Sequence, residues 1–348
     1  MIIAKKKILV EPPFIVAEIS GNHNGKFGIL KKTVNAAIKC GVDAIKLQTY
    51  KPEDLTLKIK KKDFLVKGTA AKWDKKYLFE IYKKGQTPVK WYKKIFQICK
   101  KKKKLCFTSP FNPQTIKELE KLGCPAYKIA SLEITNHSLL KAISKTKKPV
   151  IISTGGATLT EIKRALNIFK KNKNVALLKC TVKYPANPEI TNLKTIESLQ
   201  KKFKKVTIGF SDHTVGTAAS ILAVSLGAKI IEKHFILNKK INSIDNFFSA
   251  DPIEMKNLVK DCKSVKKYLG KVFYGPTKDE IPSMKHRRSI YFAKNVRKGK
   301  KLNKDDIAIV RPSHGTNLKF LKKIIGKKLD KNYQMGDKLS NNFTRVLR

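Results

Sequence analysis

Two histidines follow predicted β-strands and are separated by a predicted helix. His213 lies in Gly209-Phe-Ser-Asp-His-Thr214, His234 lies in Ile230-Ile-Glu-Lys-His-Phe235, and a small, apolar segment joins them. A strand, a crossover helix and a second parallel strand would place both imidazoles at one edge of a sheet, about one strand spacing apart. Two neutral imidazoles there could hold one divalent metal ion and leave positions open for water and substrate. The alternative is a pair of hydrogen-bonded loop histidines.

Three charged side chains interrupt or end other apolar runs. Glu18 follows Phe14-Ile-Val-Ala, and Lys46 and Lys128 lie within strand-like segments rather than on polar helix faces. A buried carboxylate needs a partner, so Glu18 is either a general base or hydroxyl acceptor, or a salt-bridge partner of Lys46. Together with Ser131 and Ser153, the two lysines predict a pocket for a phosphate or carboxylate. The alternative is that both lysines extend their charged ends to solvent.

Other polar residues follow the same predicted strands. His23 either caps a loop or contacts substrate, and Asp212 either orients the site or closes an Asx-turn. The remaining candidates at strand ends are Gln48, Ser109, Thr154, Tyr184 and Ser211.

Short β-branched runs alternate with longer, lysine-rich amphipathic segments. Continuous apolar character is typical of strands buried on both faces, and eight such strands in about 250 residues predict a (βα)₈ TIM barrel. An open, doubly wound sheet is the second choice, but the loop after the first strand lacks its glycine pattern. The expected strands are Phe14–Ile19, Ala44–Thr49, Leu105–Ser109, Ala126–Ala130, Val150–Thr154, Val175–Cys180, Val206–Phe210 and Lys229–His234. The expected helices include Gly28–Cys40, Pro88–Lys103, Pro113–Leu122, Ser138–Thr146, Thr160–Phe169, Leu193–Lys202 and Thr217–Leu226.

The amino-acid composition of the chain changes near its C-terminal end. Residues 268–287 are rich in Gly, Pro and charge, which is typical of a linker. Beyond them, short apolar runs at 289–293, 307–310 and 346–347 predict a small, mostly β module. We therefore expect a catalytic barrel over 1–267, a linker over 268–287 and a second domain over 288–348.

The composition is strongly basic, with a formal net charge of +50. Only 7 of the 76 basic residues are Arg, and the lysines are spread along the whole chain without interleaved aromatics. This argues against specific nucleic-acid recognition, and favours a solvated surface that also draws anionic small molecules to a cleft. Without a membrane-length apolar run, an apolar leader or a Cys-x-x-Cys pair, the chain is expected to be cytoplasmic, with reduced thiols.

Several segments, in this order, resemble the sialic acid synthase family. The tail from Arg288 to Pro312 is similar to the family's C-terminal antifreeze-like (SAF) domain, and Asp245 lies in a further matching segment. The other matching segments are Ala17-Glu-Ile-Ser-Gly-Asn-His-Asn-Gly25, Lys46-Leu-Gln-Thr-Tyr50, Tyr127-Lys-Ile-Ala-Ser131, Ile152-Ser-Thr-Gly155, Cys180-Thr-Val-Lys-Tyr-Pro185, Gly209-Phe-Ser-Asp-His-Thr214 and Glu232-Lys-His-Phe235.

Within that family the sequence motifs are most similar to those of the pseudaminic acid synthase branch. The discriminating pieces are Ser20-Gly-Asn-His-Asn24, Leu47-Gln-Thr-Tyr-Lys-Pro52 and Ala130-Ser-Leu-Glu-Ile-Thr135. The chain departs from the family pattern at Gly156, where Met is usual, and at Val182-Lys183, where small polar residues are common.

The resemblance implies condensation of phosphoenolpyruvate with the open aldehyde form of an N-acylated amino sugar, with release of phosphate. It implies that His213 and His234 bind a divalent ion, Mn²⁺ or alternatively Mg²⁺ or Co²⁺, and that Glu18 transfers a proton. Arg311 would reach the N-acyl group from the partner subunit of a domain-swapped homodimer. Phosphoenolpyruvate would be held by Lys46, Lys128, Ser131, Ser153 and Ser211, and the sugar by Gln48, Tyr184 and Asp245.

Two other functions remain open from the residues alone. A barrel aldolase would use Lys46 or Lys128 as a Schiff-base nucleophile. A basic nucleic-acid-binding protein would bind polyanions tightly and with a steep salt dependence.

Overall fold

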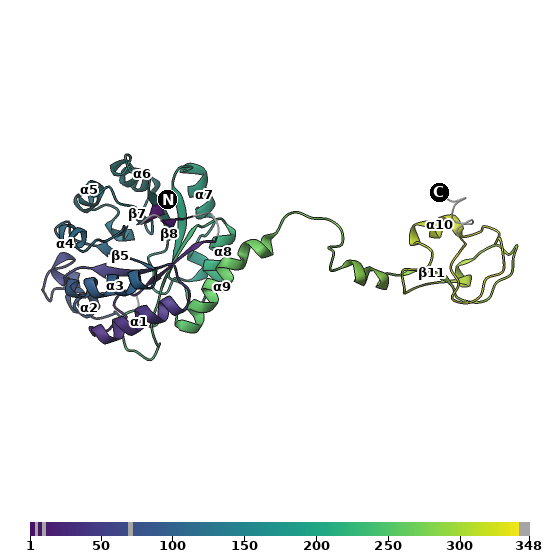
Figure 1. The fold of residues 1–348 in the computed structure, drawn as a ribbon, viewed down its shortest axis with the longest axis horizontal. Helices are drawn as coiled ribbons and strands as arrows, with labels where there is room; N and C mark the ends of the chain where they lie inside the picture. The colour runs from purple at the N-terminus through teal and green to yellow at the C-terminus, as the bar shows by residue number, and fades with distance from the viewer. Residues whose placement is uncertain (4–5, 9–11, 69–71, 341–348) are drawn as a thin grey trace. The chain divides into compact units, whose positions relative to one another are not determined.

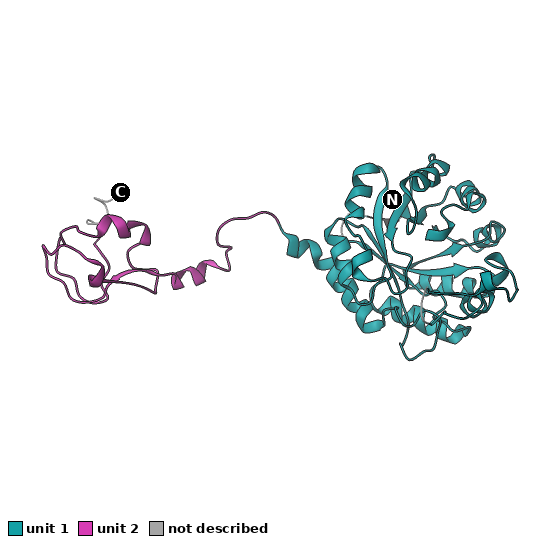
Figure 2. Ribbon diagram, turned by 180° about the vertical axis from the view of Figure 1, so that it is seen from behind, with its two compact units in different colours: residues 1–270 teal, residues 271–348 magenta. Residues whose placement is uncertain are grey.

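The computed structural model describes residues 1–3, 6–8, 12–68 and 72–340. The chain divides into two compact units, Met1–Gly270 and Lys271–Arg348 (Figure 2). Each has its own apolar core. The candidate site lies within the first unit.

A closed barrel of parallel strands forms the first unit (Figure 1). Neighbours in sequence are neighbours in space, and β10 pairs with β3 to close the sheet. The (βα)₈ TIM barrel predicted from the sequence is therefore confirmed. Its strands are β3 (Phe14–Glu18), β4 (Ala44–Thr49), β5 (Leu105–Pro110), β6 (Tyr127–Ile129), β7 (Val150–Ser153), β8 (Val175–Cys180), β9 (Thr207–Asp212) and β10 (Ile230–His234).

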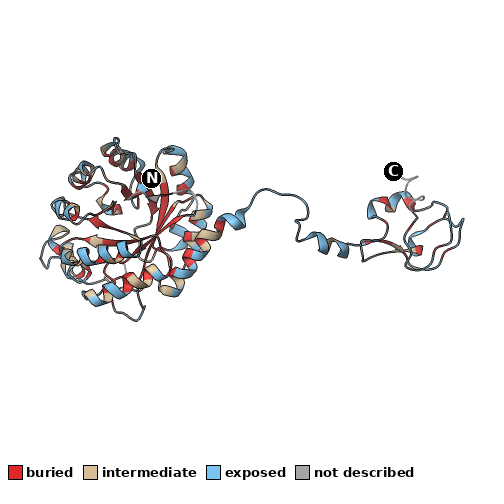
Figure 3. Ribbon diagram, in the orientation of Figure 1, coloured by how far each residue is buried: buried red, intermediate tan, exposed pale blue. Residues whose placement is uncertain are grey.

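Helices surround this barrel and cover its outer face. Residues on both faces of the strands are buried, while the helices present one buried and one exposed side (Figure 3). That burial pattern explains why the strands are continuously apolar and the helices amphipathic. The helices are α1 (Phe27–Lys39), α2 (Leu78–Gly85), α3 (Tyr92–Lys101), α4 (Thr115–Lys121), α5 (His137–Lys145), α6 (Leu159–Ile168), α7 (Thr195–Lys202), α8 (Ala218–Ser225) and α9 (Pro252–Leu269).

Local signals fix several helix ends. Thr158 and Glu161 form a capping box at the start of α6. Gly41, Gly123 and Gly227 follow α1, α4 and α8 with positive φ values of 89°, 75° and 87°, which a glycine adopts without strain. Each therefore ends its helix and turns the chain toward the next strand.

Two short antiparallel pairs complete the described structure. β1 (Ile2–Ile3) pairs with β2 (Lys6–Lys7) ahead of the barrel. In the second unit β11 (Ser289–Phe292) pairs with β12 (Ile307–Val310), and α10 (Leu321–Ile324) follows. The predicted run at 346–347 lies outside the described residues. Across residues 1–3, 6–8, 12–68 and 72–340, no helix is long and apolar enough to cross a membrane.

Candidate active site

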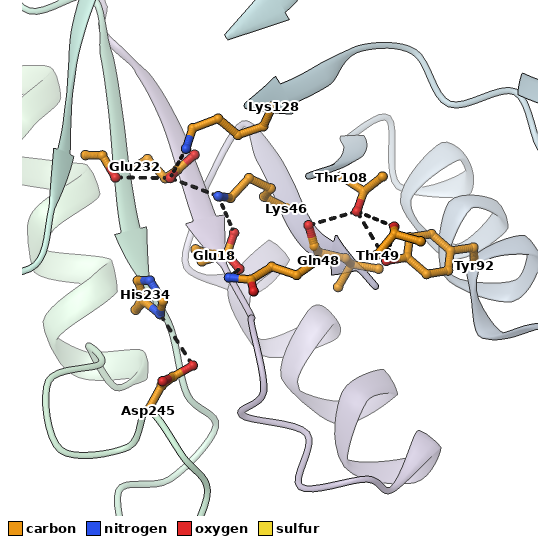
Figure 4. Close-up of polar contacts among 12 residues, drawn as sticks. Glu18, Lys46, Gln48, Thr49, Tyr92, Thr108, Lys128, Glu232, His234 and Asp245 are labelled. Atoms are coloured by element: carbon orange, nitrogen blue, oxygen red, sulfur yellow. Dashed lines mark hydrogen bonds and ion pairs between the residues drawn. The ribbon is translucent and has the colours of Figure 1, made fainter. Parts of the chain in front are cut away.

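A buried ammonium lies between two carboxylates at the seam that closes the barrel. Glu18 of β3 and Lys46 of β4 are direct partners in the parallel register, and Lys46 Nζ is 2.8 Å from Glu18 Oε2. Gln48 Nε2 donates to Glu18 Oε1 over 3.1 Å. Glu18 and Lys46 are 0% and 4% exposed, so the salt bridge excludes the alternative in which Lys46 extends to solvent (Figure 4).

The second carboxylate, Glu232 of β10, was not among the residues predicted for the site. Its Oε1 lies 3.0 Å from Lys46 Nζ and 3.5 Å from Lys128 Nζ, and it accepts a 3.1 Å hydrogen bond from Ser211 Oγ. Glu232 thus connects both lysines and one serine of the predicted anion pocket (Figure 4). The available signal was its spacing, because a charge two residues before His234 on an apolar strand faces the same side.

Burial and neighbouring charges set different protonation preferences in this cluster. Burial raises the pKa of Glu18, which makes it the carboxyl that most readily holds a proton. Burial also favours the neutral acid at Glu232, but Lys128 and Lys46 outweigh it and lower that pKa to about 2. Burial opposes the charge on Lys46, yet the two carboxylates hold its pKa above the usual value. Lys128 has a lowered pKa because burial dominates there.

The serines of the predicted anion pocket, Ser131, Ser153 and Ser211, lie at or just beyond the C-terminal ends of β6, β7 and β9. Ser153 Oγ is buried and makes no hydrogen bond, so its hydroxyl is free to bind a ligand oxygen. Ser109 Oγ, on β5, is also buried and makes no hydrogen bond. Ser131 Oγ already accepts a hydrogen bond from the backbone N–H of Gly155, at 3.1 Å. These strand ends therefore carry two buried hydroxyl groups without a hydrogen-bond partner.

The two predicted metal-binding histidines lie side by side. Their ring centroids are 5.4 Å apart. His213 Nδ1 lies 2.7 Å from the carbonyl oxygen of Thr181, which can only accept, so Nδ1 carries the proton and Nε2 keeps its lone pair. His234 Nδ1 is buried without a hydrogen bond, 3.9 Å from Asp245 Oδ2. Burial and the nearby His213 lower the pKa of His234 well below its usual value, which keeps it neutral.

These histidines fit a divalent ion with open coordination positions. In its neutral form each ring presents a nitrogen with a free lone pair, as a metal ligand must. Burial opposes the charged form of His213, but Cys180 and the Thr181 carbonyl outweigh it and raise the pKa, so a bound ion would have to displace a proton from this ring. The Thr181 carbonyl holds the His213 ring in one tautomer, an arrangement typical of metal-binding imidazoles. Among the described residues, no group of three or more His, Cys, Asp or Glu is spaced to hold a metal. Water or substrate would complete the coordination.

Comparison with known proteins identifies the family. The profile of the NeuB family matches residues 33–274, and that of the SAF domain matches residues 287–337. This chain belongs to the NeuB family. The resemblance to sialic acid synthases seen in the sequence is confirmed, and the chain is an enzyme of that family.

Three relatives define the similarity further. A pseudaminic acid synthase of Campylobacter jejuni is 42% identical over 328 residues, covering 94% of this chain and 95% of that protein. An N,N'-diacetyllegionaminic acid synthase of the same species is 35% identical over 326 residues, covering 92% and 96%. The crystal structure of an N-acetylneuraminic acid synthetase from Leptospira borgpetersenii, in complex with citrate, matches with a TM-score of 0.69 and 32% identity, covering 79% of this chain and 91% of that one.

In this NeuB family member an aromatic cluster lies against the histidine pair. The ring centroid of Tyr184 is 4.3 Å from that of His213, and Phe248 is 4.7 Å from His234. Trp73, 5.3 Å from Tyr184, donates from Nε1 to the carbonyl oxygen of Ile244 over 2.8 Å. It thereby ties the loop after β4 to the loop after β10. Sequence reasoning found Tyr184 but missed Trp73 and Phe248, because no local pattern marks a contact across 171 residues.

Asp245, Arg311 and His23 are further candidates from the sequence. Asp245 is buried in the loop after β10, where the Ser20 hydroxyl and the Gly21 backbone hydrogen-bond to its carboxylate. Arg311 is exposed in the second unit, and its reach to a partner subunit stays a prediction. His23 caps its own loop: Gly25 N–H donates to Nδ1, and Nε2 bonds the hydroxyl of Thr87.

Proposed function

We propose that this chain is a pseudaminic acid synthase. It condenses phosphoenolpyruvate with 2,4-diacetamido-2,4,6-trideoxy-L-altrose and yields pseudaminic acid and phosphate. The observation that carries the chemistry is a pair of adjacent histidines, of which burial keeps His234 neutral, together with buried lysines, carboxylates and unpaired serine hydroxyls. The choice of sugar is supported by the higher identity to the pseudaminic acid synthase than to the legionaminic acid synthase of one organism.

The reaction forms one carbon–carbon bond and breaks one carbon–oxygen bond. The C3 carbon of phosphoenolpyruvate attacks the aldehyde carbon of the sugar, and a new carbon–carbon bond forms. Water adds at C2, and the bond from C2 to the bridging oxygen breaks, so that phosphate leaves with that oxygen. One water proton goes to a base as water adds, and the second leaves with the phosphate as C2 becomes the carbonyl carbon. The aldehyde oxygen gains a proton from an acid and becomes a hydroxyl group.

His213 and His234 would hold a divalent ion, with Mn²⁺ preferred and Mg²⁺ or Co²⁺ as alternatives. Imidazole nitrogens suit such ions, and two protein ligands leave room for a substrate oxygen. The ion would act as a Lewis acid on the aldehyde oxygen. If His213→Ala leaves both Mn²⁺ binding and phosphate release intact, this assignment is wrong.

Lys46, Lys128, Ser131, Ser153 and Ser211 would bind the anionic groups of phosphoenolpyruvate. An arriving phosphate would raise the pKa of Lys128, which burial lowers in the free protein. Glu18 would move the proton, since burial already raises its pKa and Gln48 Nε2 fixes its orientation. Neither role requires movement of the barrel strands.

The sugar would lie on the side of the histidines where Tyr184 and Asp245 are found. Tyr184, Gln48 and Asp245 would contact its hydroxyl and amide groups. Arg311 of the partner subunit would contact an N-acyl group, which requires a domain-swapped homodimer. Sedimentation of the full chain tests the dimer, and Arg311→Ala tests the contact by raising the KM for the sugar alone.

The decisive experiment is phosphate release from phosphoenolpyruvate in the presence of Mn²⁺. Three sugars are offered in parallel: the altrose derivative, the legionaminic acid precursor and N-acetylmannosamine. Release only with the altrose derivative, abolished by a chelator, is the expected result. Release with another sugar instead keeps the mechanism and overturns the substrate. No release with any sugar overturns the proposal.

A further inference from the structure

A second buried ion pair lies behind the two histidines. Asp212 of β9 and Lys233 of β10 are partners in the parallel register, and each directly precedes one of the histidines. Lys233 Nζ is 2.9 Å from Asp212 Oδ2. Side chains alternate along a strand, and Ser220 of α8 donates to Asp212 Oδ2 over 2.6 Å, so the pair faces the helix layer.

The pair also holds the backbone on both sides of His213. Lys233 Nζ donates to the carbonyl oxygen of Thr214 over 2.8 Å. Asp212 Oδ1 accepts hydrogen bonds from the Thr214 backbone N–H and hydroxyl, each of 2.8 Å. The Asx-turn foreseen at Asp212 therefore exists, and Lys233 locks it from the neighbouring strand. The position of His213 is thus coupled to the strand that carries His234.

Stability alone does not account for such a pair. Asp212 and Lys233 are each 1% exposed. Removing two charges from water at this depth can cost more than their attraction returns, and well-packed apolar residues often serve stability equally well. The Asp212 carboxylate and the Lys233 ammonium instead hydrogen-bond to the turn after β9, and the carboxylate also bonds to α8. A positional role explains those contacts.

We propose that the Asp212–Lys233 pair sets the separation of the His213 and His234 rings and thereby the affinity for the divalent ion. Both are positioning residues, because they contact neither the ion nor substrate. The inference rests on the proposed function, in which these histidines hold the ion. It adds two residues from the outer face of the barrel to the machinery of that site.

The test replaces both charges together, since either single change would leave an uncompensated buried charge. For Asp212→Asn/Lys233→Met in the full-length chain, the dissociation constant for Mn²⁺ is measured by electron paramagnetic resonance of the free ion. Loss of a partner behind a metal ligand weakens metal binding about 10- to 100-fold, and we expect that range here. Cooperative unfolding without metal and the KM for phosphoenolpyruvate stay near the wild-type values. An Mn²⁺ affinity within about twofold of wild type overturns the proposal.

A milder variant covers the case in which the double variant does not fold. Ser220→Ala removes one hydrogen bond from Asp212 and leaves the ion pair in place. It should weaken Mn²⁺ binding several-fold, and unchanged binding overturns the proposal. The control is Glu120→Gln/Lys148→Met, which removes a 2.8 Å ion pair between α4 and the segment before β7. A wild-type chain that binds no Mn²⁺ overturns the metal assignment and this inference with it, whereas equal binding by wild type and double variant overturns only the inference.

Discussion

Glu18 and Lys46 lie opposite each other on neighbouring strands, with 2.8 Å between Glu18 Oε2 and Lys46 Nζ. The same Nζ lies 3.0 Å from Glu232 Oε1 on β10. One ammonium therefore joins carboxylates from the first and the last strand of the barrel. The two carboxylates differ in their preference for a proton, because their surroundings differ.

Glu18→Gln should lower kcat for phosphate release by about 10²–10⁴-fold, the usual contribution of a positioned acid or base. The amide keeps the shape of the side chain, and Lys46 keeps its contact with Glu232 Oε1, so the charge on Lys46 stays paired. Because burial raises the pKa of Glu18, the acid limb of the wild-type kcat/KM profile should fall at a pH above 4.5, and the variant should lack that limb. Glu53→Gln, at an exposed position, is the control. A kcat within tenfold of wild type would contradict the role.

Glu232→Gln should destabilise the chain at pH 7 and much less in acid. The folded-state pKa of Glu232 is about 2, below the ordinary value of 4.5. The ionised Glu232 contributes fully to the free energy of unfolding above pH 4.5. This contribution shrinks below pH 4.5, where the unfolded chain takes up the proton, and is lost as the pH falls through 2, where the folded chain takes it up as well. Breaking a buried pair from one side costs about 3–5 kcal/mol. Urea unfolding at pH 7 and at pH 3 measures the difference, and equal losses at both values would refute it.

Trp73→Ala should raise the KM for the sugar more than the KM for phosphoenolpyruvate. The indole joins the loops after β4 and β10 through the hydrogen bond to Ile244 and through its contact with Tyr184. Trp73→Phe retains a ring but loses the N–H donor, so it separates packing from hydrogen bonding. Steady-state kinetics with each substrate varied in turn supplies the measurement. Equal changes in both KM values would indicate a general loss of structure instead.

Gly209→Ala should destabilise the barrel by about 1–3 kcal/mol through overpacking. A Cβ there would lie 2.5 Å from the carbonyl oxygen of Ile230 and 2.6 Å from Leu178 Cδ2. Gly28 in α1 is the matched control, because a Cβ there meets nothing within 4 Å. Gly28→Ala should stabilise the chain by about 0.5–1 kcal/mol, since alanine is the better helix former. Thermal unfolding of the two variants should shift in opposite directions.

The barrel was predictable because its strands are buried on both faces and therefore continuously apolar. The observed bounds of β4 and β8 coincide with the expected ranges, and the other strands differ by one or two residues at their ends. Helices α2 and α9 were not expected. For α9 a signal existed, since Asp251 and Glu254 form a capping box around Pro252.

The site was only partly predictable, for a different reason. Residues at strand ends could be found, because a closed parallel barrel collects those ends on one rim. Trp73 acts through a partner distant in sequence, and no periodicity reports such a contact. For Glu232 the two-residue spacing from His234 was the available signal. The family resemblance supplied the substrates, which neither spacing nor charge could name.

The barrel closes where its final strand, β10, pairs with β3. Lys46 acquires its second carboxylate, and His213 its companion ring, only when β10 joins the sheet. A nascent chain that has not yet emerged beyond residue 234 thus carries the earlier strands but no working centre.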